Sequence, residues 1–213
     1  MNLRWKIAQK LEIRWWRRYL QSKQPAAYLA AKRAYWQRTL ATLGLEILPE
    51  HRVLDAGCGP AGVFMVLPHC TVDAVDPLLE QYAQYLAHFA IEDYPNVRFF
   101  NQAIEDFRAE AHYDVVFCLN ALNHVANIEK SCQQIVAALA PGGRLVVTVD
   151  VHKNTALKAL FRAVPGDVLH PHQHALRDYV QLLRQHDCQI LHTQGLKSGR
   201  IFDYYAIIAT KNV

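Results

Sequence analysis

The stretch VLDAGCGPAG, residues 53–62, decides the fold, because four hydrophobic or acidic residues of strand character run directly into a glycine-rich loop. Gly57, Gly59 and Gly62 are spaced as G-x-G-x-x-G, a pattern that allows a tight turn and close approach of a ligand to the backbone. Asp55 stands two places before the first glycine. A loop built for a pyrophosphate has no obvious use for that carboxylate, so this stretch alone leaves open which ligand the loop holds.

Short apolar strands alternate with helices around this loop. The segments with a strand pattern are residues 52–57, 71–76, 97–102, 113–120, 144–151, 188–195 and 201–210, and those with a helix pattern are 77–89, 128–140 and 174–186. Nearly continuous apolar strands joined by helices predict a parallel sheet that is covered on both faces. Only LKSGR separates the last two strands, which predicts an antiparallel hairpin at the edge. The predicted class is α/β, with a seven-stranded, mostly parallel sheet, helices on both faces and an antiparallel C-terminal hairpin strand.

Length and composition are those of one globular domain with room for an appended segment. Of the 213 residues, 52% are hydrophobic and 20% are charged. No apolar run approaches the roughly 20 residues that span a bilayer, and the N-terminal segment lacks the apolar core and cleavage site of a secretory signal. Five cysteines without a C-x-x-C pair predict reduced thiols. We therefore expect a cytoplasmic protein.

The positive charge is concentrated at the N-terminus. Residues 1–38 contain ten of the 23 Lys and Arg residues but only one of the 19 acidic residues, Glu12. This segment is therefore strongly basic, whereas the rest of the chain is acidic overall. The basic segment could bind an anionic substrate, a membrane surface or nucleic-acid phosphates, or its charges could simply face water.

The same segment has the periodicity of two helices. The first, over residues 3–22, has an apolar residue at every fourth position: Leu3, Ile7, Leu11, Trp15 and Tyr19. The second is predicted over residues 25–43 and ends before Gly44. We expect a basic helical cap, residues 1–44, followed by the α/β domain, residues 45–213.

Four motifs in this order resemble the class I, Rossmann-like, S-adenosylmethionine-dependent methyltransferases: VLDAGCGPAG, VDAVDP, YDVVFCLNALNHV and LAPGGRLVVT. The resemblance covers roughly residues 45–210. It implies methyl transfer with S-adenosyl-L-methionine as cofactor, and it places Asp55 near the methionine amino group, usually through water. A cation suits that carboxylate and a pyrophosphate does not. The helix after the loop also ends by Pro68, so a dehydrogenase that binds NAD is the weaker alternative.

The resemblance also assigns cofactor contacts. Asp76 is expected to bind the ribose hydroxyls, Pro77 and Leu78 to flank the adenine, and Asn120 to lie beside the sulfonium. Gln102 stands where the family usually has an acid that contacts the adenine amino group, and this departure puts the adenine contacts in doubt. The predicted cofactor-binding residues are Asp55, Gly57, Gly59, Gly62, Asp76, Pro77, Leu78, Gln102, Ala103, Ile104 and Asn120.

Histidines are the candidates for catalysis. His124, after the fourth strand, and His152, after the fifth, are predicted as base or substrate contact, with packing as the alternative for both. His170 and His172 in HPHQH fall in a loop that faces the pocket in similar proteins, so they are candidate substrate contacts, with a solvated or structural role as the alternative. No acid or cysteine completes an obvious ligand set around them, so no metal is expected.

The acceptor is expected under the N-terminal helices. Their aromatic and cationic residues suit an anionic or flat aromatic small molecule. The residues predicted to contact it are Arg14, Trp15, Trp16, Arg18 and Tyr19. The alternatives are that the aromatic residues pack on the body, that the helix lies on an anionic membrane surface, or that it binds nucleic-acid phosphates. Nucleic acid is disfavoured, because no accessory RNA-binding module and no NPPY-like tetrapeptide occur.

The sequence therefore predicts a methyltransferase that acts on an oxygen or nitrogen of a small molecule. The alternative is a non-catalytic protein that kept the cofactor site and uses its basic helices to bind a membrane, a nucleic acid or a protein. The acceptor and the oligomeric state do not follow from the sequence.

Overall fold

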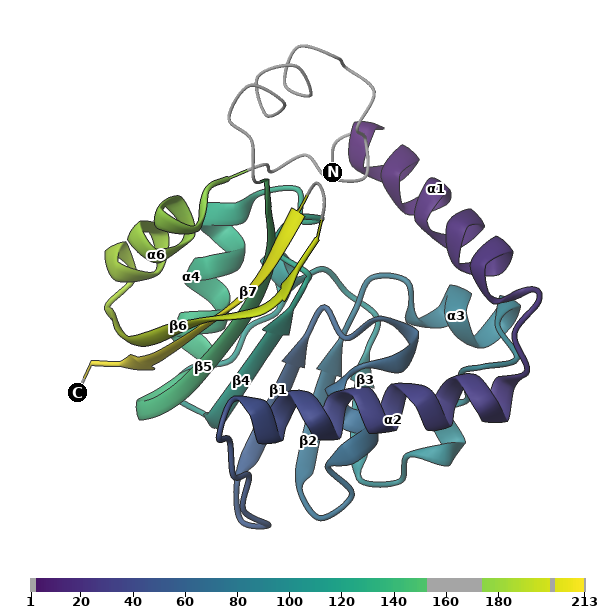
Figure 1. The fold of residues 1–213 in the computed structure, drawn as a ribbon, viewed down its shortest axis with the longest axis horizontal. Coiled ribbons are helices and arrows are strands. Elements are labelled where there is room, and N and C mark those ends of the chain that lie inside the picture. Colours follow the sequence, from purple (N-terminus) through teal and green to yellow (C-terminus); the bar gives the residue numbers. More distant parts are fainter. Residues whose placement is uncertain (1–2, 153–173, 200–201, 213) are drawn as a thin grey trace.

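The computed structural model describes residues 3–152, 174–199 and 202–212. Its strands are β1 (Arg52–Ala56), β2 (Thr71–Val75), β3 (Val97–Phe100), β4 (Tyr113–Leu119), β5 (Leu139–His152), β6 (Cys188–Ser198) and β7 (Phe202–Lys211). They form one sheet in the order β3-β2-β1-β4-β5-β7-β6 (Figure 1). Neighbouring strands from β3 to β5 are parallel, whereas β7 is antiparallel to both β5 and β6. The predicted seven-stranded, mostly parallel sheet with an antiparallel C-terminal strand is confirmed.

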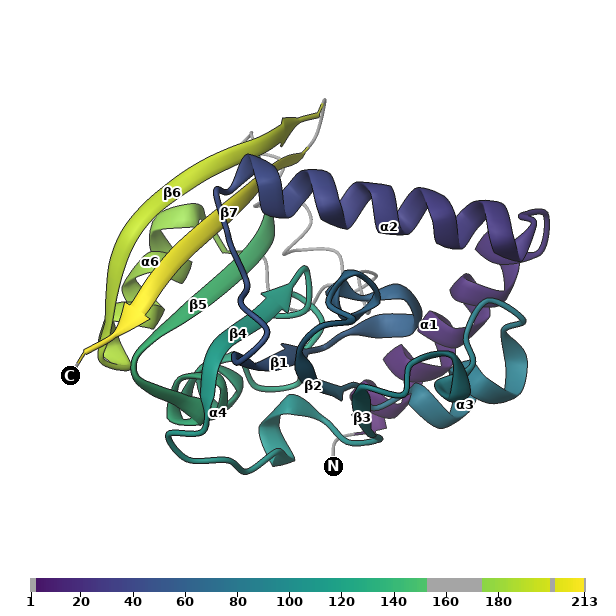
Figure 2. The same ribbon diagram turned by 90° about the horizontal axis from the view of Figure 1, so that it is seen from below.

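Helices cover both faces of this sheet. The α-helices in the described residues are α1 (Leu3–Leu20), α2 (Pro25–Thr42), α3 (Leu79–Tyr85), α4 (Ile128–Ala138) and α6 (Leu176–Gln185). On one face α2 packs on the turn Val63–Val66 and α1 packs on α3, while α4 and α6 pack together on the other face (Figure 2). Successive residues of β1 point into opposite cores, Val53 toward α2 and Leu54 toward α4. The apolar strands are therefore buried on both sides, as a parallel sheet requires.

Local signals fix the helix ends. Pro25 opens α2, where its fixed φ suits the first turn, and Gly44 follows the helix with φ +60°. Asn127 caps α4 by accepting a 2.9 Å hydrogen bond from the backbone N–H of Lys130. The helix expected over 77–89 is shorter, because the buried Leu86 adopts an extended backbone at its end.

The buried face of α1 differs from the face that the four-residue spacing suggests. Ile7, Leu11, Trp15 and Tyr19 are between 37% and 49% exposed, whereas Ile13 and Leu20 are buried. Every fourth residue advances about 40° beyond a full helical turn, so a strict four-residue repeat winds around the helix instead of following one face. The helix is confirmed, but its contact with the body is made by other residues.

Candidate active site

A cavity of about 1060 Å³ lies at the carboxyl ends of the strands. The loops after β1, β2, β3 and β4 form its floor, and α1 and α2 form the opposite wall. Ligands of open α/β sheets bind at this edge, where the connections from neighbouring strands diverge. The volume is in the range of cavities that hold small organic ligands.

The glycine loop brings its backbone to the cavity. Gly57 has φ +73°, and a Cβ at this position would lie 2.3 Å from Cβ of Ala121. Gly59 has φ +60° and faces open space, and its N–H donates a 3.0 Å hydrogen bond to Oδ2 of Asp76. The loop continues only as the 3-10 turns Gly59–Ala61 and Val63–Val66. It therefore lacks the long helix whose N-terminus binds a pyrophosphate in dinucleotide sites.

Asp76 follows β2 and faces the same cavity. Its Oδ1 accepts the N–H of Leu78 at 2.9 Å and its Oδ2 accepts that of Gly59 at 3.0 Å, so the carboxylate is held rigidly. Each oxygen keeps a further lone pair for a ligand donor. Burial, and next to it the charge of Glu12, raise the pKa of Asp76 to about 7.

Asp55 lies below the glycine loop rather than in the cavity wall. Its Oδ2 accepts a 3.2 Å hydrogen bond from the backbone N–H of Phe64, and burial raises its pKa to about 7. A Cβ at Gly62 would lie 2.4 Å from Oδ2 of Asp55. The third glycine of the motif is thus required by close packing against this carboxylate. Asp55 and Gly62 do not line the cavity, and neither does the buried Leu78.

Glu12, the single acid of the basic segment, projects from α1 into the cavity. The buried Tyr82 hydroxyl donates to its Oε1 at 3.5 Å, and burial raises the pKa of the Glu12 carboxyl. Glu12 and Asp76 are close enough for the charge of Glu12 to raise the pKa of Asp76. The carboxylates of Glu12 and Asp76, which come from opposite walls, are therefore neighbours in the cavity. Glu12 was not among the predicted site residues, and its only signal was its position in a helix otherwise rich in Lys and Arg.

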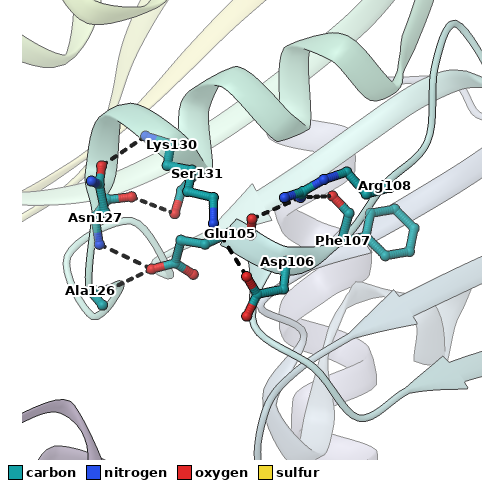
Figure 3. Close-up of polar contacts among 8 residues, drawn as sticks. All are labelled: Glu105, Asp106, Phe107, Arg108, Ala126, Asn127, Lys130 and Ser131. Atoms are coloured by element: carbon teal, nitrogen blue, oxygen red, sulfur yellow. Dashed lines mark hydrogen bonds and ion pairs between the residues drawn. The ribbon is translucent and has the colours of Figure 1, made fainter. Parts of the chain in front are cut away.

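The loop after β3 contributes Ala103, Ile104 and Glu105 to the cavity wall, whereas Gln102 does not line it. Glu105 is buried, and its Oε1 accepts the N–H groups of Ala126 and Asn127 at 2.7 and 3.0 Å (Figure 3). The side chain therefore ties the β3 loop to the loop after β4. Glu105 was also missed, because nothing local in IED distinguishes it from a solvated acid.

The loop after β4 places two predicted residues in the cavity wall, Asn120 and His124. Asn120 has φ +55°, and its N–H donates to the carbonyl oxygen and to Oγ1 of Thr148 at 2.9 and 3.0 Å. The chain therefore turns sharply at the end of β4 and directs the following residues across the mouth of the sheet.

Aromatic residues of α1 and α2 line the opposite wall: Trp5, Trp15, Trp16, Tyr19, Tyr28, Tyr35 and Trp36. The wall is fixed to the floor, because Nε1–H of Trp36 donates a 2.8 Å hydrogen bond to the carbonyl oxygen of Ala61. Trp15, Trp16 and Tyr19, which were predicted to contact the acceptor, thus line the cavity. Arg14 and Arg18 line a separate surface pocket instead, so the cavity geometry gives their predicted substrate contact no support.

Comparison with known proteins identifies the family. Residues 28–193 match the family model described as "Methyltransferase domain". The chain belongs to this family. The fold of this chain is that of class I methyltransferases. Members of this class use S-adenosylmethionine as cofactor.

Curated proteins of the same kind resemble part of this chain. The ubiquinone biosynthesis O-methyltransferases of Rickettsia bellii and Xylella fastidiosa are 28% and 34% identical over 119 residues, which is 54% of this chain. These residues are 49% and 47% of the relatives' own lengths, so the chain spans about half of the curated relatives that it matches.

Solved structures share the fold of this methyltransferase. The YcgJ protein of Bacillus subtilis has a TM-score of 0.65 at 16% identity and aligns over 82% of this chain and 97% of its own. The 1,6-didemethyltoxoflavin-N1-methyltransferase of Burkholderia thailandensis, determined with 1,6-didemethyltoxoflavin and S-adenosylhomocysteine, has a TM-score of 0.58 at 20% identity. It aligns over 92% of this chain and 84% of its own.

The side chains of the other predicted histidines lie outside the described part of the structure. His170 and His172 lie outside the described residues, and of His152 only the backbone, at the end of β5, is described. Within the described ranges no group of three side chains could hold a metal ion. In the same part of the chain, no helix has the length and apolar character needed to cross a membrane.

Proposed function

We propose that this chain transfers a methyl group from S-adenosylmethionine to an oxygen or nitrogen atom of a small, flat or anionic molecule. One observation carries the proposal: a single cavity is lined by the glycine loop and Asp76, by the aromatic wall of α1 and α2, and by His124. A cofactor surface and an aromatic acceptor surface that face the same cavity are what a two-substrate transfer requires.

The floor of the cavity fits the cofactor. Asp76 presents free lone pairs to the two ribose hydroxyls, and Pro77 and Ile104 offer apolar surface to the adenine. Gly59 leaves open space above its backbone, so the ligand can approach the loop closely. S-Adenosylmethionine supplies, when bound, a methyl group on a cationic sulfur that needs no acid to leave.

The chain's own contribution is to orient the acceptor and to exclude water. The aromatic wall would stack on a flat acceptor and cover it from solvent. His124 would take the proton from a hydroxyl acceptor, a role needed only if the acceptor atom is protonated. We propose residues 1–44 as the cap that holds the acceptor and residues 45–213 as the domain that holds the cofactor, with Glu12 reaching from the first to the second.

The kind of acceptor follows from the wall and from the relatives. The matched relatives are named O-methyltransferases of ubiquinone biosynthesis, and the Burkholderia enzyme is named for an N1 position of toxoflavin. Together with the seven aromatic residues that α1 and α2 contribute to the cavity, these names support a cyclic acceptor with a hydroxyl or ring nitrogen. We also place the protein in the cytoplasm, supported by its five buried, unpaired cysteines.

Calorimetric titration with S-adenosylmethionine, S-adenosylhomocysteine and NAD tests the cofactor first. Micromolar binding of the two sulfur compounds without NAD is the expected result. Release of S-adenosylhomocysteine in the presence of a panel of phenols, carboxylic acids and nitrogen heterocycles then tests catalysis. Cofactor binding without turnover on any class would instead favour a non-catalytic binding protein, and binding of NAD alone would reject the proposal.

A further inference from the structure

Lys32 is a cation surrounded by aromatic rings. It projects from α2 into the cavity, where its Nζ lies 5.9, 5.6 and 5.9 Å from the ring centroids of Tyr28, Tyr35 and Trp36. These distances are at the outer limit of cation–π attraction, so the rings stabilise the ammonium only weakly. The side chain is half-buried, and this burial lowers the pKa of Lys32.

Among the described residues, this ammonium has no anionic partner. No ion pair joins Lys32 to a carboxylate of the described residues. Four acids line the cavity. Asp76 and Glu105 each accept two backbone N–H groups, and Glu12 accepts the hydroxyl of Tyr82. The fourth, Asp150, forms no ion pair with Lys32 among the described residues. A partly desolvated cation without a counter-ion costs free energy, and an anionic ligand would remove that cost.

A second donor on the same helix also lacks a partner. The hydroxyl of Tyr28, one turn before Lys32, is buried and makes no hydrogen bond in the structure. Buried polar groups are nearly always hydrogen-bonded, so this enclosed hydroxyl is a second polar group of α2 that the described residues leave unsatisfied. Lys23 differs from Lys32, because its Nζ lies 4.6 Å from the ring of Tyr19 at the end of α1 and is held there.

We propose that Lys32 recognises a negatively charged group on the methyl acceptor. The acceptor is therefore a planar organic acid. Its ring packs on the aromatic wall, and its carboxylate or phenolate contacts Nζ of Lys32. The inference rests on the proposed function, because it names the substrate class of the same cavity. It also replaces the arginines as the source of charge recognition, since Arg14 and Arg18 line a different pocket. Lys32 is a specificity residue and takes no part in moving the methyl group.

Two probes of equal shape test the proposal. 2-Naphthoate and 2-naphthamide are titrated calorimetrically into the wild-type protein, both with and without saturating S-adenosylhomocysteine. A direct ionic contact is worth about tenfold or more in affinity, so naphthoate should bind at least that much tighter than naphthamide. Lys32→Met keeps the alkyl stem and should abolish the difference, whereas Lys32→Arg should retain most of it. Lys10→Met removes an exposed lysine of α1 outside the cavity and should leave the difference unchanged.

Equal affinity of the two probes for the wild type, a preference that survives in Lys32→Met, or no binding of naphthoate at millimolar concentration would each overturn the inference. The titration with S-adenosylhomocysteine alone separates this failure from failure of the proposed function. If S-adenosylhomocysteine binds and the acid preference is absent, only the assignment of Lys32 fails. If S-adenosylhomocysteine does not bind, the proposed function fails. The probe titrations without S-adenosylhomocysteine then still show whether Lys32 gives the cavity a preference for naphthoate over naphthamide.

Discussion

The indole Nε1–H of Trp36 donates a 2.8 Å hydrogen bond to the carbonyl oxygen of Ala61, and this bond joins the aromatic wall to the glycine loop. Both residues are buried and both line the cavity. The side of the cavity proposed for the acceptor and the side proposed for the cofactor are therefore joined by a direct contact. A change in the position of α2 would move the backbone that faces the cofactor.

Trp36→Phe should lower the free energy of unfolding by about 1–3 kcal/mol, because the buried carbonyl of Ala61 loses its donor while most of the ring packing is kept. S-Adenosylmethionine should also bind several-fold more weakly. Urea denaturation and calorimetry measure the two effects. Trp15→Phe is the matched control, since Trp15 is 49% exposed, and it should leave both quantities unchanged. An equal effect of the two substitutions would show that the hydrogen bond is not responsible.

Asp76→Asn should weaken binding of S-adenosylmethionine and S-adenosylhomocysteine by at least about tenfold. An amide cannot accept at both positions, so its NH₂ group would face the N–H of Gly59 or of Leu78 and misplace the side chain. Calorimetric titration of both ligands checks the loss, and Glu80→Gln, an exposed acid of α3, is the control. Unchanged affinity in Asp76→Asn would remove Asp76 from the cofactor site.

The two carboxylates Asp55 and Asp76 predict a stability that falls with rising pH. Their pKa values in the folded protein, about 7, lie above the value of about 4 for an unfolded chain. Between these values the unfolded state has lost protons that the folded state keeps, so stability of the free protein decreases from about pH 4 to about pH 7. Urea denaturation across this range measures the decrease.

Glu12→Gln should make this decrease smaller, because it removes the charge of Glu12 beside Asp76. Saturating S-adenosylmethionine, a cation, should stabilise the protein more at about pH 8 than at about pH 5. A pH-independent free energy of unfolding in the wild type would contradict the assignment of raised pKa values to these acids.

His124→Ala should reduce turnover of a hydroxyl acceptor by about 10²-fold or more if His124 takes the acceptor proton. Affinity for S-adenosylhomocysteine should not change, because the proposed cofactor contacts lie elsewhere. His112→Ala serves as control, since His112 precedes β4 and so lies at the opposite edge of the sheet. Steady-state rates as a function of pH give the result. Full activity of His124→Ala would assign the side chain to packing.

Glu105→Ala should destabilise the fold by about 2–3 kcal/mol, because the N–H groups of Ala126 and Asn127 lose a shared ionic acceptor. Asp106→Ala is a close control: it removes only an exposed ion pair with Lys130, which is worth at most about 1 kcal/mol. Thermal or urea unfolding of the two variants distinguishes them. Similar losses in both would mean that the loop after β4 is held by other contacts.

The sequence by itself determined the features that depend on neighbouring residues. The alternation of strands and helices, the glycine loop after β1 and the acid that ends β2 are local patterns, and strand ends of a parallel sheet necessarily meet at one edge. The resemblance of four motifs to a known family predicted the family and the cofactor, and it indicated that Asp76, Asn120 and His124 lie at one cavity, which they line. The antiparallel last strand follows from the shortness of LKSGR.

Only the tertiary structure decided which face of each N-terminal helix meets the body. Aromatic and charged residues occur all around α1, so the spacing alone did not show that Ile13 and Leu20 are buried and Ile7 and Leu11 exposed. For the same reason Glu12 and Lys32, rather than Arg14 and Arg18, enter the cavity. Glu105 was equally hidden, because its hydrogen-bond partners are about 20 residues away in the chain. The rotation of a helix and the contacts of a distant loop depend on packing between elements, which no local pattern encodes.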